Sequence, residues 1–220
     1  AMKQIAKSGK KILFVATKKQ AKGIVAETAA LLNMPYITER WPGGLLTNFA
    51  TIRKSIKKMQ TIDKMKEDGT FDTLSKRERL QIDRQRAKLD LNLGSIVKMT
   101  RMPEAIFIID TNKENIALAE ANKLGIRSFA MNDTNTNPSR VSFPIPANDD
   151  ASKSIECILS IVSKAIAEGL AERDSDQNKK AEEKKEKAKQ ITEGLEEVVA
   201  DQDKKYDKKK GKSRKRIQEK

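Results

Sequence analysis

Short apolar runs alternate along the chain with stretches in which apolar residues recur every three or four positions. The runs at 11–17 and 104–110 are bounded by charged residues, as expected for strands buried on both faces of a sheet. Shorter runs at 34–38 and 126–131 predict two more strands, and two prolines confine the run at 143–146 to a sheet edge. Strands that alternate with helices form parallel sheets covered on both faces, so the pattern predicts an α/β fold.

Helix-start signals follow several of these runs. Thr17 with Gln20, and Thr111 with Glu114, have the spacing of a capping box, so helices are expected to begin there. An aspartate at 149–150 is expected to cap a last helix that carries apolar residues on one face. The elements therefore follow one another as β-α-β units.

Between the second and third expected strands the period changes. From Leu45 to Met65 apolar residues recur at steps of four and three, and Gly69 follows as a C′ residue. Ser75 and Glu78 form a capping box that opens a second helix with a narrow apolar stripe. Two such helices joined by a short turn predict an antiparallel helical hairpin, inserted in the α/β fold as a coiled-coil arm.

The pattern divides the chain into four segments. Residues 1–44 and 102–173 form the two parts of the α/β domain, and residues 45–101 form the inserted arm. Residues 174–220 are dominated by charge and poor in apolar side chains, so we expect a disordered tail.

Charge sharpens this division. The 220 residues carry a formal net charge of +14, which favours a polyanionic partner, above all nucleic acid. Residues 1–46 hold 8 basic and 2 acidic side chains, residues 47–101 hold 14 and 7, and residues 102–173 hold 7 and 10. The basic surface is therefore expected on the arm and the N-terminal block.

The inventory of reactive side chains is small. Histidine is absent, which excludes Ser-His-Asp and Cys-His catalysis by this chain alone. The lone Cys157 allows no intramolecular disulfide, and its place in the last helix predicts a buried apolar role. No apolar stretch reaches the roughly 18 residues that span a bilayer, and no signal peptide is apparent, so we expect a soluble, unsecreted protein. An enzyme is not expected.

Five blocks of sequence, in order, resemble one family. They are Phe14 to Gln20 (FVATKKQ), Arg40 to Phe49 (RWPGGLLTNF), Pro103 to Asp110 (PEAIFIID), Asn132 to Asn135 (NDTN) and Ile145 to Ala151 (IPANDDA). With a basic helix after the second block, the chain resembles bacterial-type ribosomal protein S2 over most of residues 1–170. The family usually begins with some tens of further residues, including a His-Phe-Gly-His stretch and a strand, so this sequence is expected to start inside the helix that follows them.

The resemblance implies a flavodoxin-like α/β domain with an inserted coiled-coil arm. It also implies a structural constituent of the small ribosomal subunit that binds small-subunit ribosomal RNA, without a cofactor or small-molecule substrate. Neighbouring small-subunit proteins, possibly including the OB-fold protein S-one, are the implied protein partners. The expected location is the bacterial cytoplasm, with an organellar ribosome as the alternative.

The basic residues of the arm and of its root are the candidate RNA contacts, because their excess is larger than solubility requires. Their alternative role is a solvated helix face interleaved with carboxylates. Trp41 can stack on a base or pack at the root of the arm, and packing is favoured because aromatic residues make up only 4% of the chain. The candidates are Lys18, Lys19, Arg40, Trp41, Arg53, Lys54, Lys57, Lys58, Arg77, Arg79, Arg84, Arg86, Lys88, Lys98 and Arg101.

A second function stays open at this point. Lys18 and Lys19 follow the first strand at a helix N-terminus, where α/β folds often bind phosphate, so a nucleotide-binding flavodoxin-like enzyme or sensor is the alternative. The glycine pattern of a phosphate-binding loop is missing there. Four aspartates near strand ends (Asp110, Asp133, Asp149 and Asp150) can either gather around Mg²⁺ or cap turns and helices, and capping is the simpler interpretation.

Overall fold

The computed structural model describes residues 1–177. Its contacts divide the chain into two units, Ala1–Ala171 and Glu172–Lys220, and the first contains the elements discussed below. Residues 174–177, in the second unit, are helical, where the sequence had predicted the start of a disordered tail. The rest of the predicted tail, residues 178–220, lies outside the described residues.

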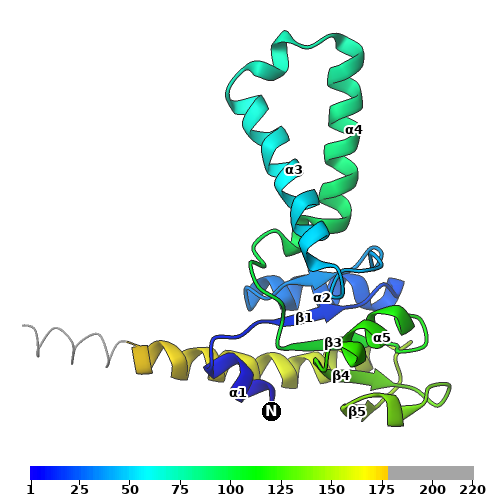
Figure 1. Ribbon diagram of the computed structural model, residues 1–220. Helices are drawn as coiled ribbons and strands as arrows, with labels where there is room; N and C mark the ends of the chain where they lie inside the picture. Colours follow the sequence, from blue (N-terminus) through cyan, green and yellow to red (C-terminus); the bar gives the residue numbers. More distant parts are fainter. Residues whose placement is uncertain (178–220) are drawn as a thin grey trace, which may run out of the picture. The chain divides into compact units, whose positions relative to one another are not determined.

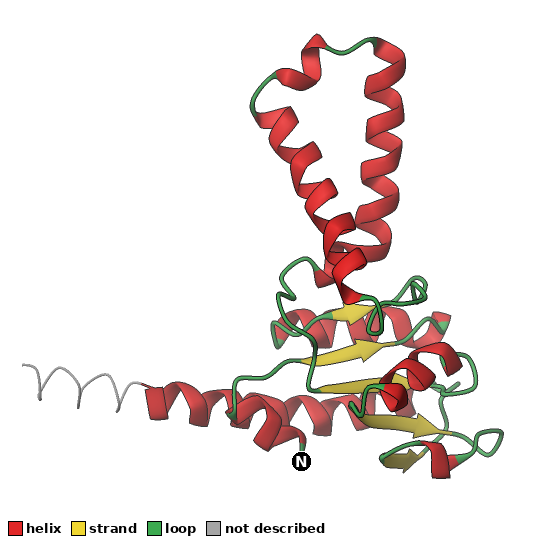
Figure 2. Cartoon of the chain, in the orientation of Figure 1, coloured by secondary structure: helices red, strands yellow, loops and turns green. Residues whose placement is uncertain are grey.

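Five parallel strands form one sheet in the order β2-β1-β3-β4-β5 (Figures 1 and 2). This is the strand order of the flavodoxin-like doubly wound fold, which confirms the predicted fold class. The strands are β1 (Ile12–Val15), β2 (Tyr36–Ile37), β3 (Ala105–Ile109), β4 (Arg127–Asn132) and β5 (Phe143–Pro146). The two prolines of β5 lie at the edge of the sheet, as predicted.

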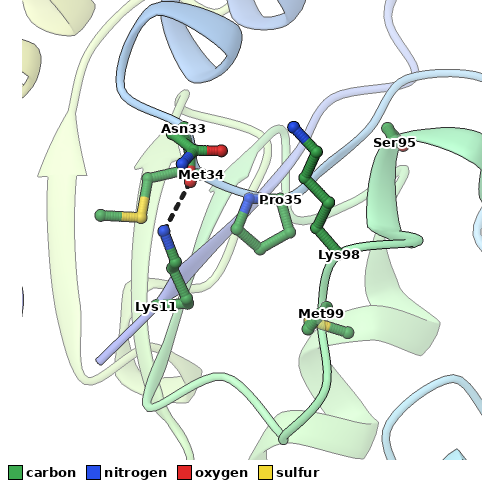
Figure 3. Close-up of a pocket in the computed structure, with 7 residues that line it drawn as sticks. All are labelled: Lys11, Asn33, Met34, Pro35, Ser95, Lys98 and Met99. Carbon is green, nitrogen blue, oxygen red and sulfur yellow. Dashed lines mark hydrogen bonds between the residues drawn. The ribbon is translucent and has the colours of Figure 1, made fainter. Parts of the chain in front are cut away.

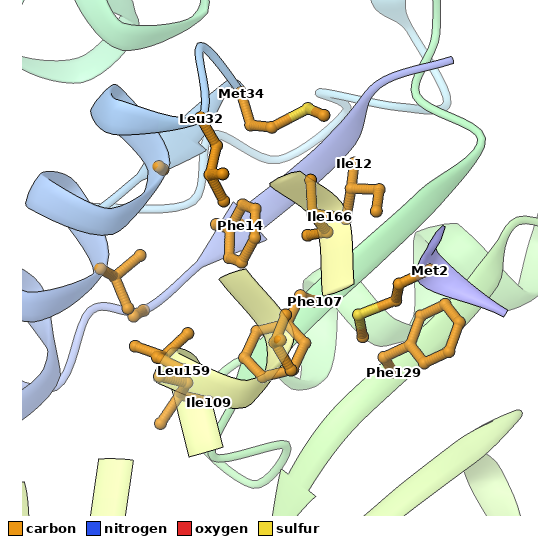
Figure 4. Packing of buried hydrophobic residues seen from close by; sticks show 14 of the residues in the cluster. Met2, Ile12, Phe14, Leu32, Met34, Phe107, Ile109, Phe129, Leu159 and Ile166 are labelled. Atoms are coloured by element: carbon orange, nitrogen blue, oxygen red, sulfur yellow. The ribbon is translucent and has the colours of Figure 1, made fainter. Parts of the chain in front are cut away.

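Helices cover both faces of the sheet. On one face, Phe14 and Phe107 pack with Leu159 and Ile166 of the helix over residues 152–177 and with residues of α1 (Met2–Lys7) and α2 (Lys19–Leu31), as Figure 4 shows. On the other face, Leu13 and Ile106 pack with α5 (Asn115–Lys123) and with the root of the arm. Because β1 and β3 are buried on both faces, they are continuous apolar runs rather than alternating ones.

The arm consists of two antiparallel helices, α3 (Phe49–Glu67) and α4 (Lys76–Leu93) (Figure 1). The chain leads away from the sheet along α3 and returns toward it along α4. A turn with Gly69 at φ 73° and a short 3-10 helix, η1 (Thr70–Thr73), join their far ends. The predicted capping box is present: Ser75 accepts from the Glu78 N–H, and the Glu78 carboxylate accepts from the Ser75 N–H. A second 3-10 helix, η2 (Gly94–Ile96), returns the chain to the body.

Several local predictions were wrong. The helix of the arm begins at Phe49 rather than Leu45, because the preceding turn folds back onto the body and buries Leu45 there. The Thr17 hydroxyl does not cap α2 but donates to the carboxylate of Glu114, and Glu114 is therefore not part of a capping box for α5 either.

Two predictions for the last helix also fail. Asn148, not Asp149, accepts from the backbone N–H groups that precede the helix, those of Asp150 and Ala151. Cys157 is exposed, because Ile155 and Leu159 occupy the buried face of the helix on either side of it.

Candidate nucleic-acid interface

The outer face of α3 carries a row of lysines without carboxylates. Ile56, Met59 and Ile62 are buried on the inner face of this helix. The only acidic residues of α3 are Asp63 and Glu67, and Asp63 pairs with Arg86 of α4. Lys54 lies three and four residues before Lys57 and Lys58, and Lys57 lies seven before Lys64, so these residues share one side of the helix. We call this row the α3 lysine strip; it consists of Lys54, Lys57, Lys58 and Lys64, all exposed and, among the described residues, without an ion pair.

The helix α4 has a different charge pattern. Arg86 donates to Asp63 across the arm at 2.9 Å and to Asp90 on its own helix at 3.1 Å, and these two carboxylates raise the pKa of its guanidinium. Arg79 lies 3.6 Å from Asp72. A second pair across the arm joins Lys66 to Asp83 at 2.6 Å. The charges facing the partner helix are therefore paired across the arm, while Arg77, Arg84 and Lys88 have no ion pair within the described residues and face solvent.

One carboxylate organises the turn at which the arm leaves the body. Glu120 of α5 is buried, with 8% of its surface exposed, and it accepts hydrogen bonds from residues 41–47. The backbone N–H groups of Gly44, Leu46 and Thr47 donate to it at 2.7, 3.0 and 3.1 Å. Burial raises the pKa of Glu120, but these hydrogen bonds outweigh it and hold the pKa below its ordinary value. Gly44 adopts φ 83°, the left-handed conformation that lets these N–H groups converge.

Three candidate residues lie in or near this turn. Trp41 is 7% exposed, and its ring N–H donates to Glu120 at 3.1 Å, so Trp41 packs at the root of the arm, the role that the sequence favoured. Arg40, beside it, is exposed. Arg53 is half-buried and donates to the carbonyl oxygen of Met99 at 3.2 Å, which ties the first turn of α3 to the segment that follows η2.

Lys18 lies in a cage of carboxylates at the carboxyl ends of the strands. Its ammonium group is 2.7 Å from Asp149, 2.7 Å from Asp150 and 3.3 Å from Asp110. Burial alone would lower the pKa of Lys18, but the hydrogen bonds to the three aspartates raise it above its ordinary value. A phosphate group at this place would face the same three carboxylates. The structure therefore argues against Lys18 as an RNA or nucleotide contact, whereas its neighbour Lys19 is exposed.

The four aspartates have separate roles. Asp110 accepts from the N–H groups of Asn112 and Lys113, and Asp133 accepts from that of Thr134, so capping is confirmed for these two. Asp133, Asp149 and Asp150 bring oxygens within 4.8 Å of one another. Burial raises the pKa of Asp149, whose second oxygen has no hydrogen-bond partner. Lys18 supplies the positive charge at this cluster.

Two functional residues were missed by the sequence analysis. Lys64 completes the α3 lysine strip, and its distance from Lys57 (seven residues, two helical turns) is the signal that places it there. Glu120 interrupts the buried face formed by Ala117, Leu118 and Ala121, and a charged residue in such a position indicates a buried hydrogen-bond network.

The fold and the charged surfaces together define the class: a flavodoxin-like α/β protein that carries a cationic helical insertion and whose strand-end lysine is already neutralised. No helix in the described part of the chain is long and apolar enough to cross a bilayer.

Comparison with known proteins identifies the family. The family model for ribosomal protein S2 matches residues 1–169. Curated proteins named small ribosomal subunit protein uS2 are similar: that of Phocaeicola vulgatus is 69% identical over 173 residues, which is 79% of this chain and 62% of the relative. Those of Flavobacterium psychrophilum and Flavobacterium johnsoniae are 68% and 64% identical, over 80% and 83% of this chain and 66% and 72% of the relatives.

The chain belongs to the ribosomal protein S2 family. The names of the family and of these relatives are those of a ribosomal protein, in agreement with the prediction that catalysis is not expected. The chain spans 62% of the length of the first of these relatives.

Proposed function

We propose that this protein is a structural constituent of the small ribosomal subunit and binds small-subunit ribosomal RNA through its arm. The relatives named as small-subunit proteins support the subunit assignment. The observation that carries the RNA contact is the α3 lysine strip, because its four lysines are exposed on the side of α3 away from its buried residues and, among the described residues, make no ion pair.

The mechanism is positional. Exposed lysines one or two turns apart along one side of a helix can follow a phosphate backbone, and each contact with a phosphate releases condensed counterions. Such contacts fix the position and orientation of a protein on folded RNA without reading base identity. Arg77, Arg84 and Lys88 of α4, together with Lys19, Arg40, Lys98 and Arg101 near the body, are exposed and form the second set of proposed contacts.

Arg53, Arg79 and Arg86 have a mainly structural role in this proposal. Each already meets a carbonyl or carboxylate oxygen of the chain itself, and a phosphate would have to compete with that partner. Trp41 and Lys18 are not among the proposed RNA contacts, because Trp41 is buried and Lys18 is paired with carboxylates. The acidic part of the body, residues 102–173, is the proposed contact for neighbouring small-subunit proteins, including the OB-fold protein S-one. The proposed location is the cytoplasm of a bacterium, in agreement with the bacterial sources of these relatives.

A titration against small-subunit ribosomal RNA at increasing salt tests the proposal. Changing all four lysines of the α3 lysine strip to Gln is expected to lower the magnitude of the salt slope, d log K/d log[salt], by about 3, since each lost phosphate contact removes about 0.7–0.9. The matched control is the pair Lys123→Gln and Lys153→Gln, which removes exposed lysines of the body. A slope that stays unchanged in the strip variant, with folding intact by circular dichroism, would contradict the proposal.

A further inference from the structure

We propose that a small pocket beside the root of the arm binds one unstacked nucleotide of the RNA, with its base on an apolar floor and its phosphate at Lys98. This inference rests on the proposed RNA-binding function. The pocket has a volume of about 190 Å³ and is lined by Lys11, Asn33, Met34, Pro35, Ser95, Lys98 and Met99 (Figure 3). It lies outside the α3 lysine strip and outside the carboxylate cage of Lys18.

The chemistry of the lining points to a nucleotide. Two ammonium groups, those of Lys11 and Lys98, border the pocket, and none of the residues that line it is acidic. Pro35 lies between the two lysines in Figure 3. Pro35 and Met99 belong to the apolar part of the lining, against which a base face can rest. Asn33, exposed at the edge, provides an amide that can both donate to and accept from a base edge.

The size of the pocket favours a single base. Sites for drug-sized ligands occupy about 300–1,000 Å³, so 190 Å³ is too small for a dinucleotide or a large cofactor. Sequence-specific recognition of RNA mostly uses bases that are splayed out of loops and bulges, and such a base presents one heterocycle and one adjoining phosphate. The combination of one small apolar floor and the exposed ammonium group of Lys98 matches that ligand.

The walls of the pocket are fixed by hydrogen bonds. The ammonium group of Lys11 donates to the carbonyl oxygen of Asn33 at 2.7 Å, and the N–H of Phe14 donates to the carbonyl oxygen of Pro35 at 3.0 Å. The hydroxyl of Ser95 donates to the carbonyl oxygen of Tyr36, which joins η2 to β2. A pocket whose walls are held in this way loses little conformational entropy when a ligand enters.

The pocket is continuous with the arm. Arg53, in the first turn of α3, donates to the carbonyl oxygen of Met99 in the pocket wall at 3.2 Å, and Lys54, the first member of the α3 lysine strip, is the next residue. Lys98 is exposed and has no ion pair within the described residues. We infer that an RNA strand bound along the strip reaches Lys98 and the pocket at the root of the arm.

Nuclear magnetic resonance of the methionine methyl groups tests this inference on the full chain. Met34 and Met99 line the pocket, while Met59 in the arm and Met131 in the sheet are internal references. The probes are the four nucleoside 5′-monophosphates and, separately, inorganic phosphate. We expect the nucleotides to shift the Met99 and Met34 signals with saturation at millimolar concentration, and phosphate alone to leave them nearly unchanged.

Two variants locate the ligand. Lys98→Gln removes the exposed ammonium group and is expected to weaken nucleotide binding about three- to fivefold, as expected for one solvent-exposed charge contact. Asn33→Gly removes the amide but keeps the carbonyl oxygen that holds Lys11, and glycine tolerates the φ of 51° at this position. We expect it to reduce the differences in affinity among the four bases.

The outcomes separate this inference from the proposed function. The α3 lysine strip variant should weaken RNA binding and leave the nucleotide-induced shifts of Met99 intact. If nucleotides shift neither Met34 nor Met99, or shift them equally in Lys98→Gln, the pocket is not a nucleotide site, whatever the arm does. If nucleotides shift the Met34 and Met99 signals but the strip variant binds RNA with an unchanged salt slope, the nucleotide site is supported and the proposed RNA contact of the arm is contradicted.

Discussion

Lys18 and the lysines of the α3 lysine strip carry the same ammonium group in opposite surroundings. Lys18 comes from the most apolar part of the fold, directly after β1, and has three carboxylates within 3.3 Å. Lys57 and Lys58 come from a polar helix and, among the described residues, have no acidic partner. The comparison teaches that a lysine near a helix N-terminus at the sheet edge is not by itself an anion site, since the charge around it decides what it can bind.

The largest expected effect concerns Lys18 and the carboxylates around it. Lys18→Met leaves Asp149 and Asp110 buried without their cation, so we expect the free energy of unfolding to fall by about 3 kcal/mol. Urea denaturation followed by circular dichroism measures it. Lys19→Met, at the adjacent exposed position, is the control and should change stability by less than about 0.5 kcal/mol. Equal losses in the two variants would mean that the carboxylate cage does not stabilise the fold.

A second prediction concerns the attachment of the arm to the body. Glu120→Gln replaces a carboxylate that accepts from three backbone N–H groups by an amide with one acceptor, and we expect a loss of about 2 kcal/mol in the free energy of unfolding at pH 7. Because the pKa of Glu120 is lowered in the folded state, its contribution is complete above the ordinary value of 4.5 and is lost as the pH falls through the folded pKa. The difference between wild type and variant should therefore shrink below about pH 4.5.

Thermal or urea unfolding between pH 3 and pH 8 checks this prediction. Glu27→Gln, at an exposed position on α2, is the matched control, and we expect no pH-dependent difference from wild type for it. A loss for Glu120→Gln that is the same at pH 3.5 and pH 7 would show that the charge of Glu120 is not what holds the turn.

The smallest expected effect concerns the α3 lysine strip, where an added carboxylate would make the surroundings of its lysines more like those of Lys18. Thr61 is exposed and lies four residues after Lys57, three after Lys58 and three before Lys64, so Thr61→Glu places a carboxylate within the strip. We expect RNA affinity to fall by about 1 kcal/mol, or fivefold, with stability changed by less than about 0.5 kcal/mol. Fluorescence anisotropy with labelled RNA measures the affinity, and Thr61→Gln controls for the change of side chain. An affinity equal to that of Thr61→Gln would indicate that the RNA does not approach this side of α3.

The features that could be predicted from the sequence depend on residues that lie close together along the chain. The capping box of Ser75 and Glu78 formed because both partners lie three residues apart on one helix and face solvent, where nothing competes for them. The strands β1 and β3 were equally clear, because burial on both faces leaves a continuous apolar run.

The errors arose where a distant residue competed for a local partner. Thr17 has the right spacing to cap α2, yet its hydroxyl donates to a carboxylate 97 positions away in the sequence. Lys18 had the properties of a phosphate ligand until the fold placed Asp149, 131 positions later, beside it. Such contacts depend on the order of the strands, which periodicity does not specify.

The edge strand β5 affects whether copies of this chain can associate through the edge of the sheet. The N–H of Ala147 donates to the carbonyl oxygen of Asn132 in β4, and residues two apart on a strand point the same way, so the N–H groups of Phe143 and Ile145 face β4. The outward positions are Pro144 and Pro146, which have no N–H to offer. A second chain therefore finds no ladder of donors along this margin, and open-ended stacking of copies into aggregates is blocked there by two pyrrolidine rings.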